Sequence, residues 1–179
     1  MPDRKRTVIG LAEIKQIIPH RYPILLVDSV SAVEPGRRLT AHKAVTGHEP
    51  CYAGLDDDAT SGDYAYPMSL LLESWAQAAV LLVLWERPNP DVLADKVELF
   101  AAISKAELLG PVFPGDVLEH RVELVRAAAD AALLTGASFV NGRKILQIGT
   151  YTLVRREIDA LSPGIDGASA RSAGHHRTW

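Results

Sequence analysis

The chain has 179 residues, of which 47% are hydrophobic and 23% are charged, and its formal net charge is −3. That length and composition are typical of one globular domain with a real core, and the charge excludes the basic footprint of a nucleic-acid-binding protein. Cys51 is the single cysteine, which excludes an intrachain disulfide and a metal site built from several cysteines.

The start of the chain and its longest apolar run decide the expected compartment. No apolar segment follows the charged residues 1–6, so we expect no secretory signal and a cytoplasmic protein. The longest apolar run, residues 67–85, is slightly short for a membrane span and carries Glu73 and Gln77 near its middle. We therefore interpret this run as a core helix, with no membrane partner.

The first predicted element is a short helix over residues 10–18, where apolar side chains recur at helical spacing until Pro19 ends the pattern. Residues 24–30 are rich in Ile, Leu and Val, which predicts a strand. A turn is expected at residues 34–38, which contain a Pro-Gly pair, and a second strand follows over residues 39–46.

Residues 47–66 have no periodicity and are rich in Gly, Pro, Asp and Thr, which predicts a long loop. Loops of this length inside a compact domain are usually functional or mobile. The acidic residues 56–58 are expected to be solvated surface, because consecutive carboxylates lack the spacing of a calcium loop. Tyr66 is a candidate for lining the entrance to a site, because it immediately precedes the next predicted element.

A long helix is predicted over residues 67–85. Pro67 is tolerated just ahead of a helix, Ser69 can cap its first free N–H groups, and Pro88 prevents much continuation beyond Trp85. Its apolar residues surround the helix instead of forming a stripe, so the helix should be buried on most sides. Other elements must therefore wrap around it.

Glu73 and Gln77 are the strongly polar residues of this helix and lie on one face, one turn apart. A carboxylate in an apolar setting is costly to keep ionised, which suits general acid or base chemistry. The alternative is a structural role, with Glu73 held by backbone donors or by a basic partner. The residues alone leave both interpretations open.

The second half of the chain is predicted to be extended, with a tight hairpin turn at Asn141-Gly142 and a rigid turn at residues 110–116. From residue 162 the chain is rich in Gly, Ala and Ser, so residues 162–179 are expected to be a disordered tail. The predicted strands cover residues 96–108, 117–128, 132–139 and 144–155.

These elements predict an α+β fold, in which one long helix packs against a curved antiparallel sheet of about five to six strands. We expect a single domain over residues 1–161. A single sheet wrapped around one helix leaves an edge strand exposed, and pairing of that edge with a second copy would cover it. We therefore expect a dimer.

The sequence resembles the hot-dog-fold 3-hydroxyacyl-acyl-carrier-protein dehydratases of the FabZ type. Residues 17–30, with Pro19-His20-Arg21-Tyr22-Pro23 at their centre, match the long opening motif of that family. Further matches are Val45-Thr46 with Glu49-Pro50, Glu73 through Gln77, and the Pro-Val-x-Pro-Gly-Asp motif at residues 111–116. The likeness extends from about residue 8 to about residue 157.

This resemblance implies a hot-dog fold with active-site tunnels at a dimer interface. Each family site takes a histidine from one subunit and a carboxylate from the other, and uses no metal or redox cofactor. The histidine removes a proton from the carbon next to the thioester, and the carboxylate protonates the departing hydroxyl. By this resemblance Glu73 is the catalytic carboxylate and Gln77 positions it. At the start of the helix, Pro67 and Met68 are expected to contact substrate, as is Tyr66 from its place just before them.

The family histidine has no counterpart in this sequence. Where the family reads Gly-His-Phe-Pro, the chain reads Gly54-Leu55-Asp56-Asp57, so Leu55 occupies the position of the base beside the substrate. Counting back from Glu73 gives Ala59 instead, because the loop is about four residues longer here. In the family a glycine follows the proline at the start of the helix, and it lets the backbone approach the acyl carbonyl closely. Met68 occupies that position here.

Three explanations for the missing base are open. His48 could be a substitute base, although a lone histidine is more often structural; we expect His20, in the opening motif, to be structural too. Alternatively, the chain is the Glu-donating subunit of a heterodimer whose paralogous hot-dog partner carries the histidine. The third explanation is a catalytically silent acyl-binding or stabilising subunit, and a more distant one is an acyl thioesterase that uses Glu73 to activate water.

The substrate of this family is carried by acyl carrier protein, an acidic protein that docks beside the tunnel through charge complementarity. The positions just before the Pro-Val-x-Pro-Gly-Asp motif, which tend to be basic in the family, hold Leu109 and Gly110 here. Lys105, Arg37 and Arg38 are the remaining basic candidates, and docking could instead belong to a partner subunit.

Overall fold

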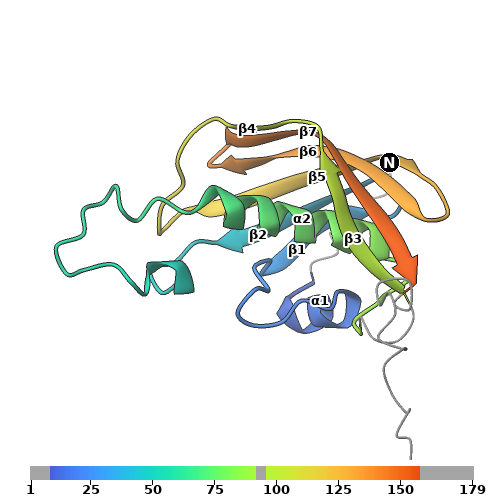
Figure 1. Ribbon diagram of the computed structural model, residues 1–179, viewed down its shortest axis with the longest axis horizontal. Helices are drawn as coiled ribbons and strands as arrows, with labels where there is room; N and C mark the ends of the chain where they lie inside the picture. The colour runs from blue at the N-terminus through green and yellow to red at the C-terminus, as the bar shows by residue number, and fades with distance from the viewer. Residues whose placement is uncertain (1–8, 92–95, 158–179) are drawn as a thin grey trace, which may run out of the picture.

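The computed structural model describes residues 9–91 and 96–157, and Figure 1 shows their arrangement. This part of the chain contains two α-helices, one short 3-10 helix and one curved sheet. The helices are α1 (Leu11–Ile17), η1 (Pro50–Tyr52) and α2 (Met68–Leu84). The strands are β1 (Ser29–Glu34), β2 (Arg38–Ala44), β3 (Lys96–Ile103), β4 (Ala106–Leu108), β5 (Val117–Ala127), β6 (Ala131–Val140) and β7 (Arg143–Glu157).

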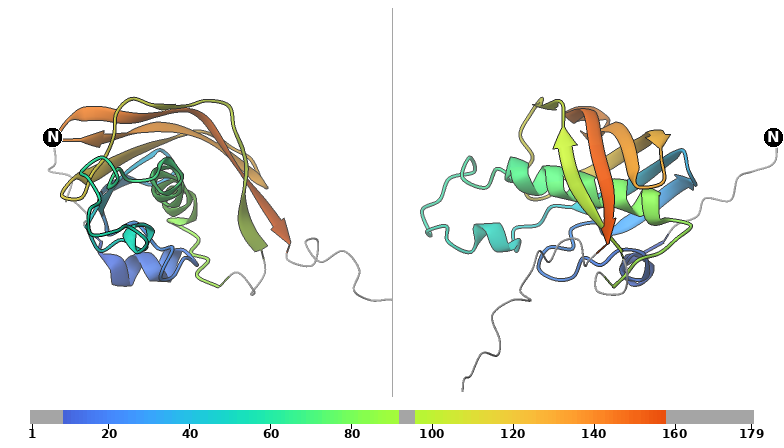
Figure 2. Two further views of the ribbon diagram at one scale, coloured as in Figure 1. Left: turned by 60° about the vertical axis from the view of Figure 1, so that its left-hand side comes forward. Right: turned by 45° about the vertical axis from the view of Figure 1, so that its right-hand side comes forward.

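The sheet is antiparallel, follows the order β1-β2-β5-β6-β7-β3, and arches around α2 (Figure 2, left). This is the predicted α+β arrangement, and it is the hot-dog fold. The described sheet has seven strands, compared with about five to six expected. The difference arises at Ser104-Lys105, which interrupt the predicted strand 96–108, so that β3 and β4 pair separately with β7.

α2 forms the centre of the core, as its apolar sequence predicts. Leu71, Trp75 and Leu81 are among its fully buried side chains. The Trp75 ring packs edge-on against Tyr151 of β7, with centroids 5.4 Å apart, and its Nε1–H donates to the Arg121 carbonyl of β5 at 3.3 Å. The helix is therefore attached to strands on both sides of β6.

The cap predicted at Ser69 is wrong. The first helical residue is Met68, which precedes Ser69. Pro67 occupies the N-cap position, and no side chain caps the helix. The Pro67 carbonyl instead accepts the amides of Leu70 and Leu71, both at 3.0 Å. Ser69 therefore lies inside the first turn, where it cannot act as the N-cap.

The strand predicted over residues 24–30 is also wrong for most of its length, because β1 begins only at Ser29. Residues 25–28 belong to no strand of the sheet. The Leu26 and Val27 amides donate to the Gln77 side chain of α2, at 2.9 and 3.4 Å, instead of to a neighbouring strand. The apolar pattern thus reports burial against the helix and not membership of the sheet.

Other local predictions are confirmed: α1 ends before Pro19, the hairpin turn lies at Asn141-Gly142, and β5, β6 and β7 follow the predicted ranges within about two residues. No helix within residues 9–91 and 96–157 has the length and apolarity needed to span a bilayer. The predicted tail, residues 162–179, lies outside the described residues.

His120 of β5 makes the stability of the fold depend on pH. The imidazole is completely buried, with Nδ1 2.8 Å from Ser138 Oγ, and burial, assisted by His42 and Lys43, lowers its pKa to about 3. An unfolded histidine has a pKa of about 6.5, so this group contributes stability that is present above pH 6.5 and is lost as the pH falls toward 3. We expect a loss of about 1.4 kcal/mol per pH unit below that point.

Urea unfolding at pH 7, 6 and 5 measures this slope. The matched control is His120→Leu with Ser138→Ala, which removes the titrating group and its hydroxyl partner together and leaves no buried polar atom behind. We expect the double variant to have the flatter dependence over this range. Parallel curves for the two proteins would contradict the assignment.

Candidate active site

Glu73 lies in the second turn of α2 and is held there by Gln77. The Gln77 side-chain amide donates to Glu73 Oε1 at 2.8 Å, which confirms that the two residues share one face of the helix. The Gln77 side chain is buried, with its residue 1% exposed, whereas the Glu73 side chain is 35% exposed. Glu73 Oε2 has no hydrogen-bond partner among the described residues, so one carboxylate oxygen is available to a ligand.

Gln77 also fixes residues 24–27, which follow the loop that carries His20. Its Nε2 donates to the Ile24 carbonyl at 2.6 Å, and its Oε1 accepts the amides of Leu26 and Val27. A buried amide with all these partners has no rotational freedom left, because each lost hydrogen bond would leave a buried polar group unpaired. The orientation of Glu73 is therefore set by the packing of α2 against residues 24–27.

A histidine lies beside Glu73. His20 Nε2 is 3.6 Å from Glu73 Oε1, and the two side chains are 25% and 35% exposed. His20 Nδ1 is buried and has no hydrogen-bond partner among the described residues. Burial lowers the pKa of the imidazole, the Glu73 charge opposes this shift, and the Arg21 charge adds to it.

The loop that carries His20 is held by its neighbour Arg21. The guanidinium of Arg21 donates to the carbonyls of Lys15, Ile18 and His20, at 2.9, 2.8 and 2.7 Å. Arg21 thus ties the end of α1 to the loop. Sequence reasoning treated His20 as structural, and no spacing rule could have paired two residues more than fifty positions apart.

Tyr151 of β7 is a second residue near Glu73 that sequence reasoning missed. Burial raises the pKa of its phenol, and the negative charge of Glu73 raises it further. Its ring stacks on Phe100 of the edge strand β3, with centroids 5.2 Å apart. An aromatic residue in a strand carries no sequence signal for such a position, because packing alone accounts for it.

The residues predicted to surround the substrate lie near the start of α2, and their roles stay predictions. Pro67 and Met68 form the N-cap and first residue of the helix, and Met68 is exposed. Tyr66 is buried: its amide donates to the Val112 carbonyl at 2.7 Å, and its hydroxyl has no partner among the described residues. Leu55 is half-buried and packs against the hydrophobic core.

The loop of residues 47–66 projects beyond the N-terminal end of α2 (Figure 1). It is long, as predicted, and contains the short helix η1. Lys43 Nζ and Glu49 Oε1 form a largely buried ion pair at 2.5 Å near its start, and the Tyr52 hydroxyl donates to the Tyr64 carbonyl at 3.1 Å. The ion pair therefore ties the start of the loop to β2, and the hydrogen bond joins two parts of the loop to each other.

His48 lies in this loop and is exposed. Its backbone amide donates to Thr46 Oγ1 at 3.4 Å, and no described hydrogen bond or ion pair joins its ring to Glu73. His48 as a substitute base stays a prediction without support from the contacts of Glu73. The imidazole that the fold brings to the carboxylate is that of His20.

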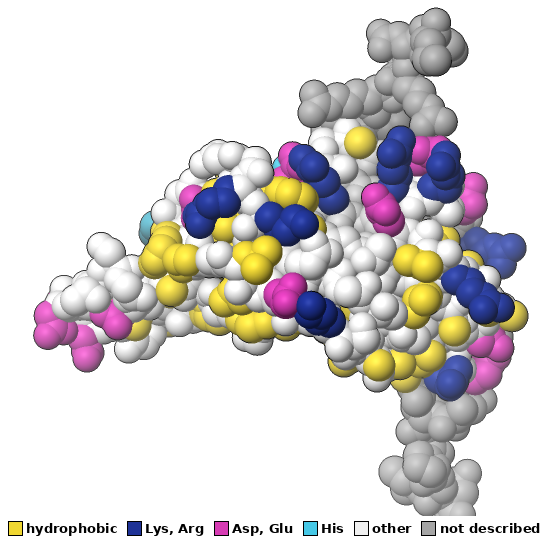
Figure 3. Space-filling view, turned by 90° about the horizontal axis from the view of Figure 1, so that it is seen from above, with side chains coloured by type: hydrophobic (Ala, Val, Ile, Leu, Met, Phe, Trp, Pro, Cys, Tyr) yellow, Lys and Arg dark blue, Asp and Glu magenta, His cyan; other side chains and the backbone are white. Residues whose placement is uncertain are grey.

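The basic candidates for carrier docking are paired with acidic neighbours. Arg37 and Arg38 both contact Glu34, and Lys105 Nζ lies 3.0 Å from Glu107 Oε1. Figure 3, seen over the sheet, shows Lys and Arg in several separate groups with acidic side chains among them. This face therefore offers dispersed positive charge and not a single basic patch.

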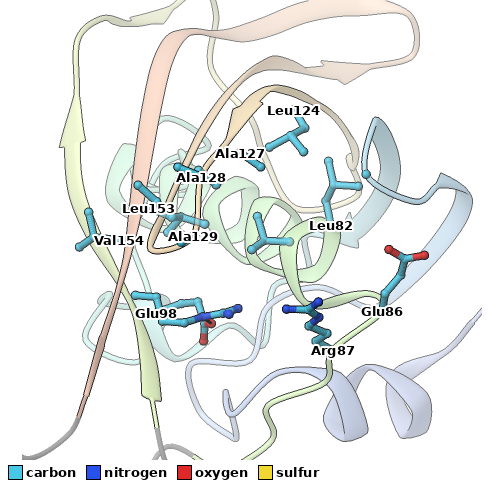
Figure 4. Close-up of a pocket in the computed structure, with 15 residues that line it drawn as sticks. Leu82, Glu86, Arg87, Glu98, Leu124, Ala127, Ala128, Ala129, Leu153 and Val154 are labelled. Atoms are coloured by element: carbon cyan, nitrogen blue, oxygen red, sulfur yellow. Dashed lines mark hydrogen bonds and ion pairs between the residues drawn. The ribbon is translucent and has the colours of Figure 1, made fainter.

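A cavity of about 370 Å³ lies at the C-terminal end of α2 (Figure 4). Apolar side chains form much of its wall, and the partly buried ion pair between Arg155 and Glu98, 2.7 Å long, also lines it. Glu73 is not among its lining residues, since that side chain belongs to the other end of the helix. The apolar part of the lining includes Leu82, Val83, Leu124, Ala132 and Leu153.

The fold and the site together define a class: a hot-dog protein in which the central helix presents a glutamine-held carboxylate beside an imidazole. Comparison with known proteins identifies the family. A family model described as a FabA-like domain matches residues 18–149. The chain belongs to the FabZ-type 3-hydroxyacyl-[acyl-carrier-protein] dehydratase family of hot-dog proteins.

Two curated relatives and one solved structure illustrate this membership. The FabZ dehydratase of Clostridium kluyveri is 35% identical over 135 residues, which cover 75% of this chain and 88% of the relative. The FabZ dehydratase of Haemophilus ducreyi is 38% identical over 141 residues, covering 79% and 88%. The dehydratase heterocomplex ApeI:P from Xenorhabdus doucetiae has the same fold, with a TM-score of 0.67 at 16% identity, covering 83% of this chain and 93% of that one.

Proposed function

We propose that this chain is a subunit of a cytoplasmic dehydratase that converts 3-hydroxyacyl thioesters, carried by acyl carrier protein, into 2-enoyl thioesters in fatty-acid or polyketide biosynthesis. The observation that carries the proposal is the geometry of Glu73. Gln77 holds Oε1 in place, while Oε2 has no partner among the described residues and the side chain is partly exposed. Such a carboxyl group can meet a substrate hydroxyl.

In this reaction a base removes a proton from the carbon next to the thioester. The electron pair of that C–H bond forms the new double bond, the C–O bond at the β-carbon breaks, and the departing oxygen takes the proton of the Glu73 carboxyl group to leave as water. Each proton transfer by a positioned group contributes roughly two to four powers of ten in rate. A site that contains Glu73 but no base therefore lacks one of the two proton transfers.

The base is proposed to come from a paralogous hot-dog subunit that carries the family histidine. In this chain Leu55 stands where that histidine is expected. Among the described residues the edge strand β3 has no partner strand on one side, and its Phe100 is 56% exposed, which favours continuation of the sheet into a second subunit. A structural neighbour described as a dehydratase heterocomplex supports a mixed pair.

A catalytically silent acyl-binding or stabilising subunit is the second candidate. The observation that favours it is Leu55, since without a base the carboxylate would bind a thioester without turning it over. A thioesterase, in which Glu73 activates water, is a more remote alternative on the same fold. These candidates predict different products from the same substrate.

The test is turnover of a 3-hydroxyacyl thioester on acyl carrier protein, followed by formation of the 2-enoyl product. The chain is purified alone and together with a hot-dog protein from the same genome that carries the Gly-His-Phe-Pro motif. We expect little turnover by the chain alone and at least about a hundredfold more by the pair. Equal turnover with and without the partner would refute the mixed dimer, and a stable pair no faster than the partner alone would favour the silent subunit.

A further inference from the structure

The contact between Glu73 and His20 is incomplete in this structure. Glu73 Oε1 already accepts the Gln77 amide at 2.8 Å, and His20 Nε2 approaches the same oxygen to 3.6 Å. A separation of 3.6 Å is beyond hydrogen-bonding range, which ends near 3.2 Å for N–H donors. Gln77 holds Oε1 in place and the His20 side chain is partly exposed, so a small rotation of the His20 ring closes the gap.

The surroundings of His20 favour a neutral ring with its hydrogen on Nε2. Nδ1 is buried without a partner among the described residues, so a proton placed there would be a buried donor with no acceptor. Burial and Arg21 both lower the pKa of the imidazole, which opposes the doubly protonated form. Glu73 is the acidic group that faces the ring, and an acceptor at that point favours the Nε2–H tautomer.

We propose that His20 is a positioning residue for the dehydration, one that donates its Nε2–H to Glu73 Oε1 while Glu73 Oε2 gives its proton to the departing hydroxyl. This inference rests on the proposed function of Glu73. No proton leaves His20 in the step: the O–H bond at Oε2 breaks, water departs with that hydrogen, and the carboxylate keeps the electron pair. His20 and Gln77 then both donate to Oε1.

The effect is specific to the transition state. A neutral carboxyl group is a weaker acceptor than a carboxylate, and hydrogen bonds to an ionised acceptor are shorter and roughly twice as strong. The His20 contact therefore strengthens as negative charge develops on Glu73, and it contributes little while substrate merely binds. An interaction of this kind raises kcat and leaves KM unchanged.

The test compares His20→Gln with His20→Asn in whichever assembly turns substrate over. The Gln amide nitrogen reaches about as far as Nε2, whereas the Asn amide ends about where Nδ1 lies, so only the Gln variant keeps a donor for Oε1. We expect His20→Gln to keep kcat within about threefold and His20→Asn to lower kcat about tenfold at unchanged KM. Equal kcat values for the two variants, or an effect confined to KM, would overturn the proposed positioning role of His20.

A second measurement does not depend on turnover. The ring nitrogens of His20, observed by 15N NMR in the intact chain, should report the Nε2–H tautomer. Glu73→Gln should lower the pKa of His20, because it removes the negative charge that opposes the effect of burial. An unchanged titration in that variant would overturn the pairing and leave the dehydratase proposal standing. Turnover missing from every assembly would instead overturn the dehydratase proposal, and with it the catalytic role of His20.

Discussion

Glu73→Gln is expected to lower dehydratase turnover of the mixed dimer by at least about a hundredfold, because an amide has no acidic proton to give to the departing hydroxyl. The substitution preserves size and leaves an oxygen that can still accept the Gln77 amide, so the fold should be retained. Enoyl product formation by the pure pair measures the effect, and thermal unfolding verifies that the variant is folded.

Glu86→Gln is the matched control for this prediction. Glu86 is exposed just beyond the C-terminal end of α2, so the same chemical change there should leave turnover within about twofold of the parent. A Glu73→Gln pair that keeps most of its activity would mean that another group protonates the hydroxyl. The central proposal for this site would then fail.

Leu55→His is expected to give the chain dehydratase activity without any partner. If two identical copies pair, each restored histidine can face the Glu73 of the other copy, and a positioned base adds roughly two to four powers of ten in rate. Leu55 is half-buried and packs against the hydrophobic core from its loop. The measurement is enoyl product formation by the purified variant compared with the parent chain alone.

Ala59→His is the companion variant, because the longer loop makes a second alignment of the histidine possible. Only the position that faces Glu73 in the assembled dimer should gain activity. Adding Glu73→Gln to the active variant should remove the gain, which shows that it uses the proposed site. Two folded variants with no gain at all would contradict a site assembled from this loop and α2.

Local patterns predicted much of the fold correctly. The apolar run bounded by prolines predicts α2 to within about one residue, and the Asn141-Gly142 pair predicts the hairpin between β6 and β7. The spacing of Glu73 and Gln77 predicts that they share one face of the helix, and the hydrogen bond between them confirms it. These features depend on residues a few positions apart, so the local sequence is enough to predict them.

Predictions failed where a segment makes its hydrogen bonds with a distant part of the chain. Residues 24–28 have the composition of a strand, yet the Leu26 and Val27 amides donate to the side chain of Gln77. The strand predicted over residues 96–108 is likewise interrupted at Ser104-Lys105, where the Ser104 amide donates to Thr150 of β7 and the Lys105 carbonyl accepts the Gly149 amide. Composition reports that a segment is buried, but not which group satisfies its amides.

The sequence by itself determined the central helix, the face that carries Glu73 and Gln77, and the family to be expected. Only the tertiary structure placed His20 next to Glu73, since Gln77 docks residues 24–27 on α2 and Arg21 holds the loop between α1 and that segment. Periodicity acts over a few residues, whereas this contact joins side chains more than fifty positions apart. It exists because the Gln77 side chain satisfies buried backbone groups of residues 24–27 and so holds that segment against the helix.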